Sequence, residues 1–158
     1  MAHALENGPL IVSVACLLSF ALCFRRFETG QPQSTKSKAA TWYQHYYSVY
    51  MYAAFNKGVD EQNSSNPSTE TAGINLEIAS INRFDNYIQT IKFPKSDKHE
   101  LNQVLIENSV LTNLDGTLAI NTSNVSNYNS LFDGVESAQA TSTAAIDLLA
   151  KDLGMNWN

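Results

Sequence analysis

The sequence predicts an all-α protein: an N-terminal membrane-anchor or signal helix, a short tether, and an antiparallel up-down four-helix bundle. Three observations support this fold class. Apolar residues recur at spacings of three, four and seven from residue 39 onward. Strand-like alternation is nearly absent there, and Pro, Gly and Asn stand where helices would begin and end. We therefore divide the 158 residues into an anchor or signal segment (1–27), a flexible linker (28–38) and a bundle (39–158).

The first segment contains an uncharged run from Pro9 to Phe24, in which Ser13 and Ser19 are the polar residues. As a helix this run would cover roughly 24 Å, slightly less than a hydrocarbon core of about 30 Å. The pair Arg25-Arg26 follows it and could reach the headgroups by snorkelling. We expect residues 9–24 to contact the membrane, in preference to forming a buried helix of a soluble core.

Cleavage or lipidation of this segment stays open. A secretory signal normally begins with basic residues, but residues 1–8 hold no Lys or Arg. Cleavage after Cys23 would also require a site that matches the usual small-residue pattern poorly. A lipoprotein reading of Cys16 or Cys23 also lacks the expected preceding residues. If residues 1–23 were removed, the domain would be secreted or exposed at the cell surface.

Two features of the sequence predict opposite sides of the membrane for the bundle. Basic residues after the span place the bundle in the cytoplasm by the positive-inside rule; they are Arg25, Arg26, Lys36 and Lys38. The domain itself is rich in Asn and Ser, poor in charge and carries three glycosylation sequons, at Asn63, Asn121 and Asn124. We favour an extracytoplasmic domain. Because both cysteines lie in the apolar run, the domain would have no disulfide.

The first two helices of the bundle follow the linker. The first is expected from Ala39 to Lys57, with Gly58 as its C′ residue. The second begins at Asn66-Pro67, an N-cap followed by a proline at the first helical position, and ends at Phe93-Pro94. Its apolar row is Ile74, Ile78, Ile81, Phe84, Ile88 and Ile91.

The third and fourth helices complete the bundle. Asp97 and Glu100 have capping-box spacing and open the third helix, whose apolar row is Leu101, Val104, Leu105, Leu111 and Leu118. Gly116 and the β-branched residues after it suggest an early end for this helix. The fourth starts near Ser123 and closes at Gly154, with an apolar row of Val125, Tyr128, Phe132, Val135, Ile146, Leu149 and Leu153. Packing four such stripes together buries all of them.

Composition argues against several classes of function. The net charge of −5 and the scattered basic residues disfavour a nucleic-acid surface. The domain has no cysteine, so thiol nucleophiles and Cys-based zinc sites are excluded. No glycine-rich phosphate loop or EF-hand ladder occurs. We expect no cofactor and no metal.

Catalytic constellations are also not found. His45 and His99 are the histidines beyond the anchor, and neither stands in a Glu-x-x-His or His-x-x-x-His motif. Both are interpreted as packed or surface residues. Four aspartates read as ordinary helix-surface charges: Asp85, Asp115, Asp133 and Asp147. We therefore expect a protein that is not an enzyme.

The stretch "TWYQHYYSVYMYAAF", residues 41–55, concentrates aromatic side chains in one helix. A helical wheel places Trp42 and Tyr46 on one face and Tyr43, Tyr47 and Tyr50 on an adjacent one. Three interpretations remain open: a thick aromatic core, a face that binds a partner or ligand, or a contact with the membrane interface. The candidate binding residues are Trp42, Tyr43, Tyr46, Tyr47, Tyr50 and Tyr52.

Together these features predict a non-catalytic, membrane-tethered, extracytoplasmic helical bundle that acts as a protein-interaction or small-ligand-binding module. Residues 9–24 would supply the membrane contact, and a protein partner is expected. One alternative is a single-pass accessory or structural subunit of a larger membrane complex, with its domain on the cytoplasmic side. Another is a small helical inhibitor or immunity-type protein.

Overall fold

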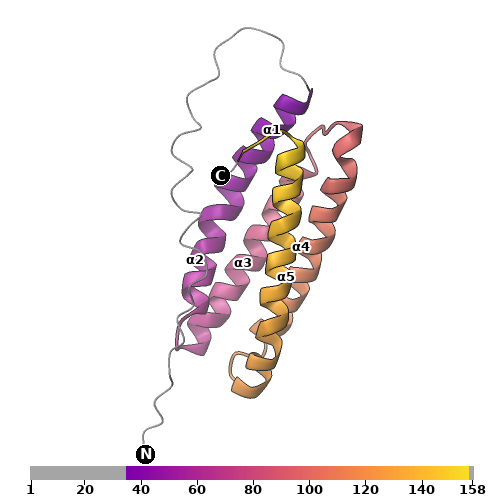
Figure 1. The fold of residues 1–158 in the computed structure, drawn as a ribbon. Coiled ribbons are helices and arrows are strands. Elements are labelled where there is room, and N and C mark those ends of the chain that lie inside the picture. The colour runs from indigo at the N-terminus through magenta and orange to yellow at the C-terminus, as the bar shows by residue number, and fades with distance from the viewer. Residues whose placement is uncertain (1–34, 157–158) are drawn as a thin grey trace, which may run out of the picture. The chain divides into compact units, whose positions relative to one another are not determined.

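The computed structural model describes residues 35–156, which are helical and contain no strand. Four long helices run side by side, and consecutive helices point in opposite directions (Figure 1). The predicted all-α bundle is therefore confirmed for this part of the chain. The predicted anchor or signal segment, 1–27, lies outside the described residues.

The first long helix is continuous but changes its winding. It consists of α1 (Thr35–Tyr46), a π-helical segment η3 (Tyr47–Tyr52) and α2 (Ala53–Gln62). The helix begins at Thr35, so residues 35–38 of the stretch assigned by composition to a linker are helical. It also extends past Gly58, where the sequence predicted its end.

Gly58 lies inside α2 because α2 crosses α3 (Pro67–Ile88) at a second glycine, Gly73. A Cβ atom added to Gly73 would stand 2.5 Å from the Gly58 carbonyl oxygen and 2.5 Å from the Gln62 backbone nitrogen. The two backbones are thus in direct contact. The expectation that Gly58 ends the helix is wrong, because this glycine serves a close helix crossing instead of a left-handed cap.

The start of α3 was predicted correctly, but its end was not. The Asn66 side chain accepts a hydrogen bond of 2.9 Å from the Ser68 backbone N–H, and Pro67 follows it. The helix ends at Ile88, five residues before Phe93. Residues 89–94 turn back over the bundle and bury the Phe93 ring, which is 9% exposed.

A short 3₁₀ turn, η4 (Lys95–Asp97), leads into α4 (Lys98–Ala119). Asp97 occupies the N-cap position, yet its side chain makes no capping hydrogen bond and instead accepts one from the Ser96 hydroxyl. The predicted capping box is therefore not formed. The helix also continues through Gly116, so the early end suggested by that residue does not occur.

The last helix, α5 (Val125–Asp152), has caps of the expected kinds. Asn124 accepts a hydrogen bond of 3.2 Å from the Asn127 backbone N–H. At the other end Gly154 has φ +78°, and the N–H groups of Gly154 and Met155 donate to the carbonyls of Lys151 and Ala150. These are the two bonds of a Schellman motif, so the predicted closure at Gly154 is confirmed.

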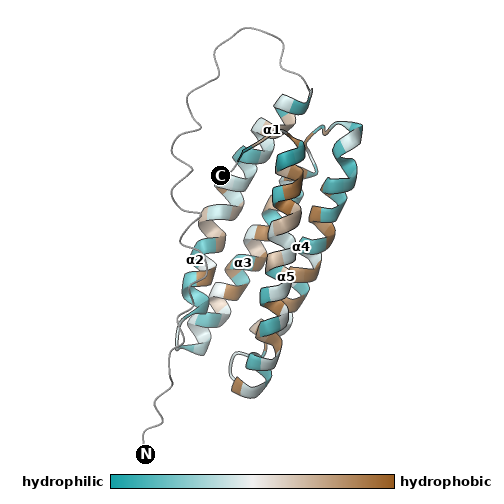
Figure 2. Ribbon diagram, viewed as in Figure 1, coloured by the Kyte–Doolittle hydropathy of each residue, from teal (hydrophilic) through white to brown (hydrophobic). Residues whose placement is uncertain are grey.

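The core lies along the apolar rows of the helices, and each helix keeps a hydrophilic outer face (Figure 2). Among the described helices, none is long and apolar enough to cross a membrane. Most of the predicted rows are buried; Val125, at 71% exposed, is an exception at the start of α5. The main buried side chains are Ile74, Ile81, Phe84, Ile88, Val104, Leu111, Leu118, Val135, Ile146 and Leu149.

Candidate binding site

The aromatic helix divides its rings between the core and the surface. Tyr43 is fully buried, and its hydroxyl donates a hydrogen bond of 3.2 Å to the Ile146 carbonyl on α5. Its ring meets Phe84 edge-on at 5.5 Å, and the Tyr47 ring meets the same Phe84 at 5.9 Å. These two tyrosines join α1 and η3 to the rest of the bundle, so they serve the core in this structure.

The outward rings form what we call the aromatic strip: Trp42, Tyr46, Tyr50 and Tyr87. Trp42 stacks on Tyr46 with ring centroids 5.7 Å apart, and Tyr46 lies 5.9 Å from Tyr50. Tyr87 of α3 stacks on Tyr50 at 4.3 Å with an interplanar angle of only 6°. Because each ring holds its neighbour, the strip presents a preorganised surface across two helices.

The π-helical segment keeps these two faces in line. The inward residues Ala39, Tyr43, Tyr47 and Met51 follow one another at intervals of four. In an α-helix a four-residue step overshoots one turn by about 40°, so three such steps would rotate the row away from the core. The wider π turn absorbs this surplus. It also aligns Tyr50 with Trp42 and Tyr46, whereas the helical wheel grouped Tyr50 with Tyr43 and Tyr47.

A groove of about 450 Å³ lies beside the end of the strip, between α1 and the turn that follows α3. Trp42 and Tyr46 form its aromatic wall, and the Trp42 side chain is 52% exposed. Lys38 from α1 and Lys92 from the turn also line it. The remaining lining residues are Thr35, Ala39, Thr90 and Ile91. The groove therefore combines flat aromatic surface with two cations, an arrangement suited to an anionic group that has an apolar part.

The six candidate residues are thus separated by the fold. Trp42, Tyr46 and Tyr50 belong to the strip, Tyr43 lies in the core, and Tyr47 and Tyr52 are half-buried. Tyr52 is 6.5 Å from Tyr47 by ring centroid. Sequence reasoning missed Tyr87 and Lys92, because α3 and the turn after it are brought against the first helix by the tertiary fold; it also missed Lys38, one turn before Trp42, because residues 28–38 were assigned to a linker. His45 is exposed next to Trp42, at 5.9 Å between centroids.

A second group of polar side chains lies inside the bundle. Glu77 of α3 and Asp115 of α4 are 2% and 0% exposed. Burial, with a further contribution from the charge of Asp115, raises the pKa of Glu77 to about 8. Burial raises the pKa of Asp115 to about 7. One oxygen of Glu77 and both oxygens of Asp115 find no hydrogen-bond partner among residues 35–156. The interpretation of Asp115 as a surface charge is therefore wrong.

A hydrogen-bonded chain connects three helices further along the core. The Asn108 amide donates to a carboxylate oxygen of Asp85 at 2.6 Å, and the Ser142 hydroxyl donates to the Asn108 carbonyl oxygen at 2.5 Å. Asp85 is half-buried, not a plain surface charge, and burial raises its pKa to about 6 although Asn108 acts in the opposite direction. This chain ties α3, α4 and α5 together at one level of the bundle.

The sequence did contain a signal for these buried polar residues. In α4 the buried positions are 104, 108, 111, 115 and 118, which alternate spacings of four and three. In α3 the buried positions 74, 77, 81, 84 and 88 show the same alternation, with Gly73 and Ser80 buried beside them. Glu77, Asn108 and Asp115 thus occupy core positions of a heptad pattern. Such polar residues can fix the register of packed helices at a cost in stability.

Among the described residues no group of three or more His, Cys, Asp or Glu side chains is arranged to hold a metal ion. No protein-family profile matches the chain, and no curated protein or solved structure shows significant similarity to it. A function must therefore be inferred from the site itself.

Proposed function

We propose that this protein is a non-catalytic, membrane-tethered helical bundle that binds a protein partner or a small ligand through the aromatic strip. The observation that carries the proposal is the stacking of Tyr50 on Tyr87 at 4.3 Å, in line with a Trp42 side chain that is 52% exposed. Tyr and Trp bury a large area with little loss of rotamer freedom, which suits a contact surface.

In this structure the rings of the strip are already stacked on one another. Its members come from α1, η3 and α3, and the rings beneath it, Tyr43 and Phe84, are fully buried. A preorganised surface loses less conformational entropy on binding than one assembled from mobile side chains. This supports binding. The hydrogen bond with the Tyr87 hydroxyl raises the pKa of Tyr50, which keeps that phenol protonated instead of activating it as a base.

The internal carboxyls also suit a structural role better than catalysis. Glu77 and Asp115 are 2% and 0% exposed, so a substrate in solution does not reach them in this structure. Their raised pKa values follow from burial, which occurs in structural as well as catalytic positions. We therefore keep the proposal that the protein is not an enzyme.

Photo-crosslinking in native membranes tests the binding proposal. A photoreactive amino acid at Val49, which is 50% exposed and adjacent to Tyr50 in the sequence, is expected to give a crosslinked species of discrete mass. The double variant Tyr50→Ser/Tyr87→Ser should abolish it. The matched control is Ile106→Ser/Val110→Ser, two exposed apolar residues one turn apart on α4. Equal crosslinking in both variants would refute the strip as the binding face.

The predicted span at residues 9–24 supplies the tether, and we propose that the bundle is presented outside the cytoplasm. A second candidate, an accessory subunit with a cytoplasmic bundle, is favoured by the basic residues that follow the span: Arg25, Arg26, Lys36 and Lys38. Protease added to intact cells should remove the bundle in the first case and leave it intact in the second.

A further inference from the structure

One end of the bundle collects most of the described basic side chains. We define the basic end as residues 35–38, 92–100 and 151–152, where α1 begins, α3 connects to α4, and α5 ends. It carries six lysines, against the acidic residues Asp97, Glu100 and Asp152. All six lysines are exposed, and none forms an ion pair within the described part of the chain; they are Lys36, Lys38, Lys92, Lys95, Lys98 and Lys151.

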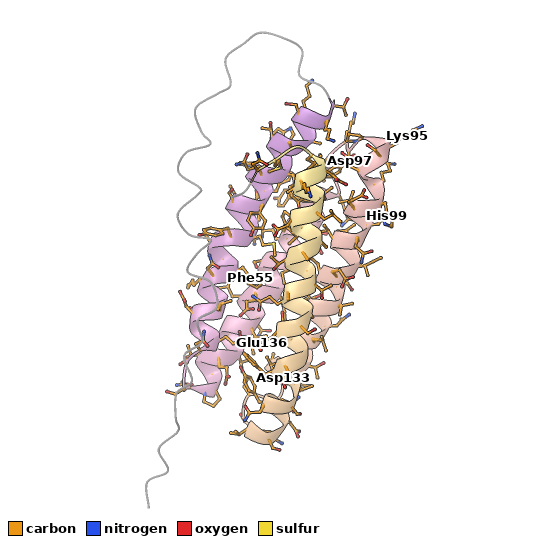
Figure 3. All side chains as sticks on the ribbon, in the orientation of Figure 1. Phe55, Lys95, Asp97, His99, Asp133 and Glu136 are labelled. Carbon is orange, nitrogen blue, oxygen red and sulfur yellow. The ribbon has the colours of Figure 1, made fainter. Side chains whose placement is uncertain are left out.

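The opposite end has the reverse charge. Residues 57–70 and 115–136 contain one lysine, Lys57, which is paired with Glu61 at 3.6 Å. They also hold six acidic residues: Asp60, Glu61, Glu70, Asp115, Asp133 and Glu136. Figure 3 shows Lys95 near one end of the bundle and Asp133 and Glu136 toward the other. The bundle is therefore polarised along its long axis, although the whole chain has a net charge of −5.

The aromatic groove opens at this basic end. Lys38 and Lys92, which both line it, belong to the six lysines, and Trp42 lines it with half of its surface exposed. Tryptophan and tyrosine are enriched at the boundary between lipid and water, and lysine reaches from there to headgroup phosphates. The groove thus combines the two kinds of side chain that bind a lipid headgroup region.

We propose that the basic end docks on an anionic lipid bilayer, with Trp42 inserted at the interface and a headgroup phosphate held between Lys38 and Lys92. The lysines are spread over three segments of one end instead of converging on a point, which fits an extended negative surface better than a single soluble anion. Each lysine near an anionic bilayer adds to the electrostatic attraction. The acidic opposite end would be repelled from the same surface, which orients the bundle.

The docking proposal rests on the proposed function, because it assumes that residues 9–24 tether the bundle to the membrane. Ten residues, 25–34, separate the predicted span from Thr35, and such a chain reaches at most about 35 Å. The basic end is the end to which this segment connects, so it stays close to the lipid surface once the span is inserted. Tyr50 and Tyr87, further along the strip, remain available to a partner.

Fluorescence of Trp42 in the full-length chain tests the docking. The substitution Trp157→Phe leaves Trp42 as the single tryptophan. The protein is combined with neutral phosphatidylcholine vesicles or with vesicles containing about 30 mol% phosphatidylglycerol. We expect brominated lipids to quench Trp42 about twofold more strongly in the anionic vesicles, with the difference lost at about 0.5 M salt.

Matched charge variants locate the contact. Lys38→Gln/Lys92→Gln should remove the extra quenching, whereas Lys57→Gln/Arg83→Gln, which also removes two charges, should retain it. Circular dichroism checks that both variants keep the helical content of the parent. Equal quenching in neutral and anionic vesicles, or equal loss in the two variants, would refute the proposal.

Two further measurements separate this proposal from others. Co-sedimentation with neutral vesicles measures the tether alone. If the protein sediments but shows no charge-dependent quenching, the proposed tether stands and the proposed docking is refuted. Inorganic phosphate is added without vesicles as the second probe. A change in Trp42 emission at millimolar phosphate would identify a soluble-anion site and overturn the bilayer as the occupant.

Discussion

The two ends of the bundle differ in where most of their polar side chains lie. Near the basic end the lysines and the aromatic strip are exposed, while Tyr43 and Phe84 fill the interior and Asp97 is a buried carboxyl. Toward the acidic end, two carboxyl groups, Glu77 and Asp115, are inside, beside the glycine crossing of α2 and α3. Exposed rings and lysines lower stability little and favour binding, whereas buried carboxyls cost stability and depend on pH.

The largest expected effect concerns the buried carboxyls. Burial raises the pKa of Glu77 from 4.5 to about 8 and that of Asp115 from 3.8 to about 7. The folded state therefore binds these protons more tightly than the unfolded chain does. Stability is highest below about pH 4 as far as these groups are concerned, and it falls as pH rises to about 8. We expect the free energy of unfolding to fall by on the order of 4 kcal/mol between pH 5 and pH 8. Denaturant unfolding at both pH values measures this change.

Substitution of one carboxyl sharpens the test. Glu77→Gln should flatten the pH dependence and raise the stability above that of the parent at pH 8, because no charge has to be buried. Asp133→Asn is the control, since Asp133 is exposed on α5. If the parent protein were equally stable at pH 5 and pH 8, the two carboxyls would not be buried as described.

The next largest effect is expected at the crossing of α2 and α3. Gly73→Ala would place a methyl group 2.5 Å from two backbone atoms, so the helices must separate. We expect a loss of about 3 kcal/mol in the free energy of unfolding, at the upper end for overpacked cores. Gly134→Ala is the matched control, because nothing lies within 4 Å of its added methyl. It should stabilise α5 by about 0.5–1 kcal/mol. Equal effects would rule out a close crossing.

The sequence predicted features that depend on local signals. The Asn66-Pro67 start and the Gly154 closure are set by backbone requirements within a few residues, and the apolar rows by helical periodicity. It failed where the reason lies on another helix. Gly58 is helical because Gly73 faces it, and a single glycine does not reveal its partner. Asp115 looks like a surface charge until the spacing of buried positions in α4 is read as a heptad.

The binding site was predictable only in part for the same reason. The density of rings in residues 41–55 identified the helix, but the division into inward and outward rings depends on the π-helical segment η3. Nothing local in the sequence predicts one extra residue in a turn. Tyr87 and Lys92 join the site through the tertiary fold, so a single-helix wheel does not find them, and Lys38 was missed because its stretch was assigned to a linker.

A somewhat smaller effect is expected for the hydrogen-bonded chain between the two ends. Asn108→Ala removes the donor to Asp85 and the acceptor for Ser142, so both are left without this partner in the core. We expect a loss of about 3 kcal/mol or less. Because Asn108 holds the pKa of Asp85 down, that pKa should rise above its value of about 6. Asn102→Ala, at an exposed position of the same helix, controls for helix propensity. An unchanged Asp85 titration in an NMR experiment would contradict the contact.

The smallest effect on stability is expected for Trp42, near the basic end, and the buried residue next to it in the sequence, Tyr43, provides the comparison. Trp42→Ser should cost less than about 1 kcal/mol, because half of the ring is already exposed and it packs on Tyr46 at the surface. Tyr43→Ser, one position later, serves as the reference and should cost about 3 kcal/mol, comparable with Gly73→Ala, since it empties a fully buried site and removes the bond to the Ile146 carbonyl. Thermal unfolding of both variants measures the difference. If Trp42→Ser were as destabilising as Tyr43→Ser, the strip would belong to the core, and its availability for binding would be lost with it.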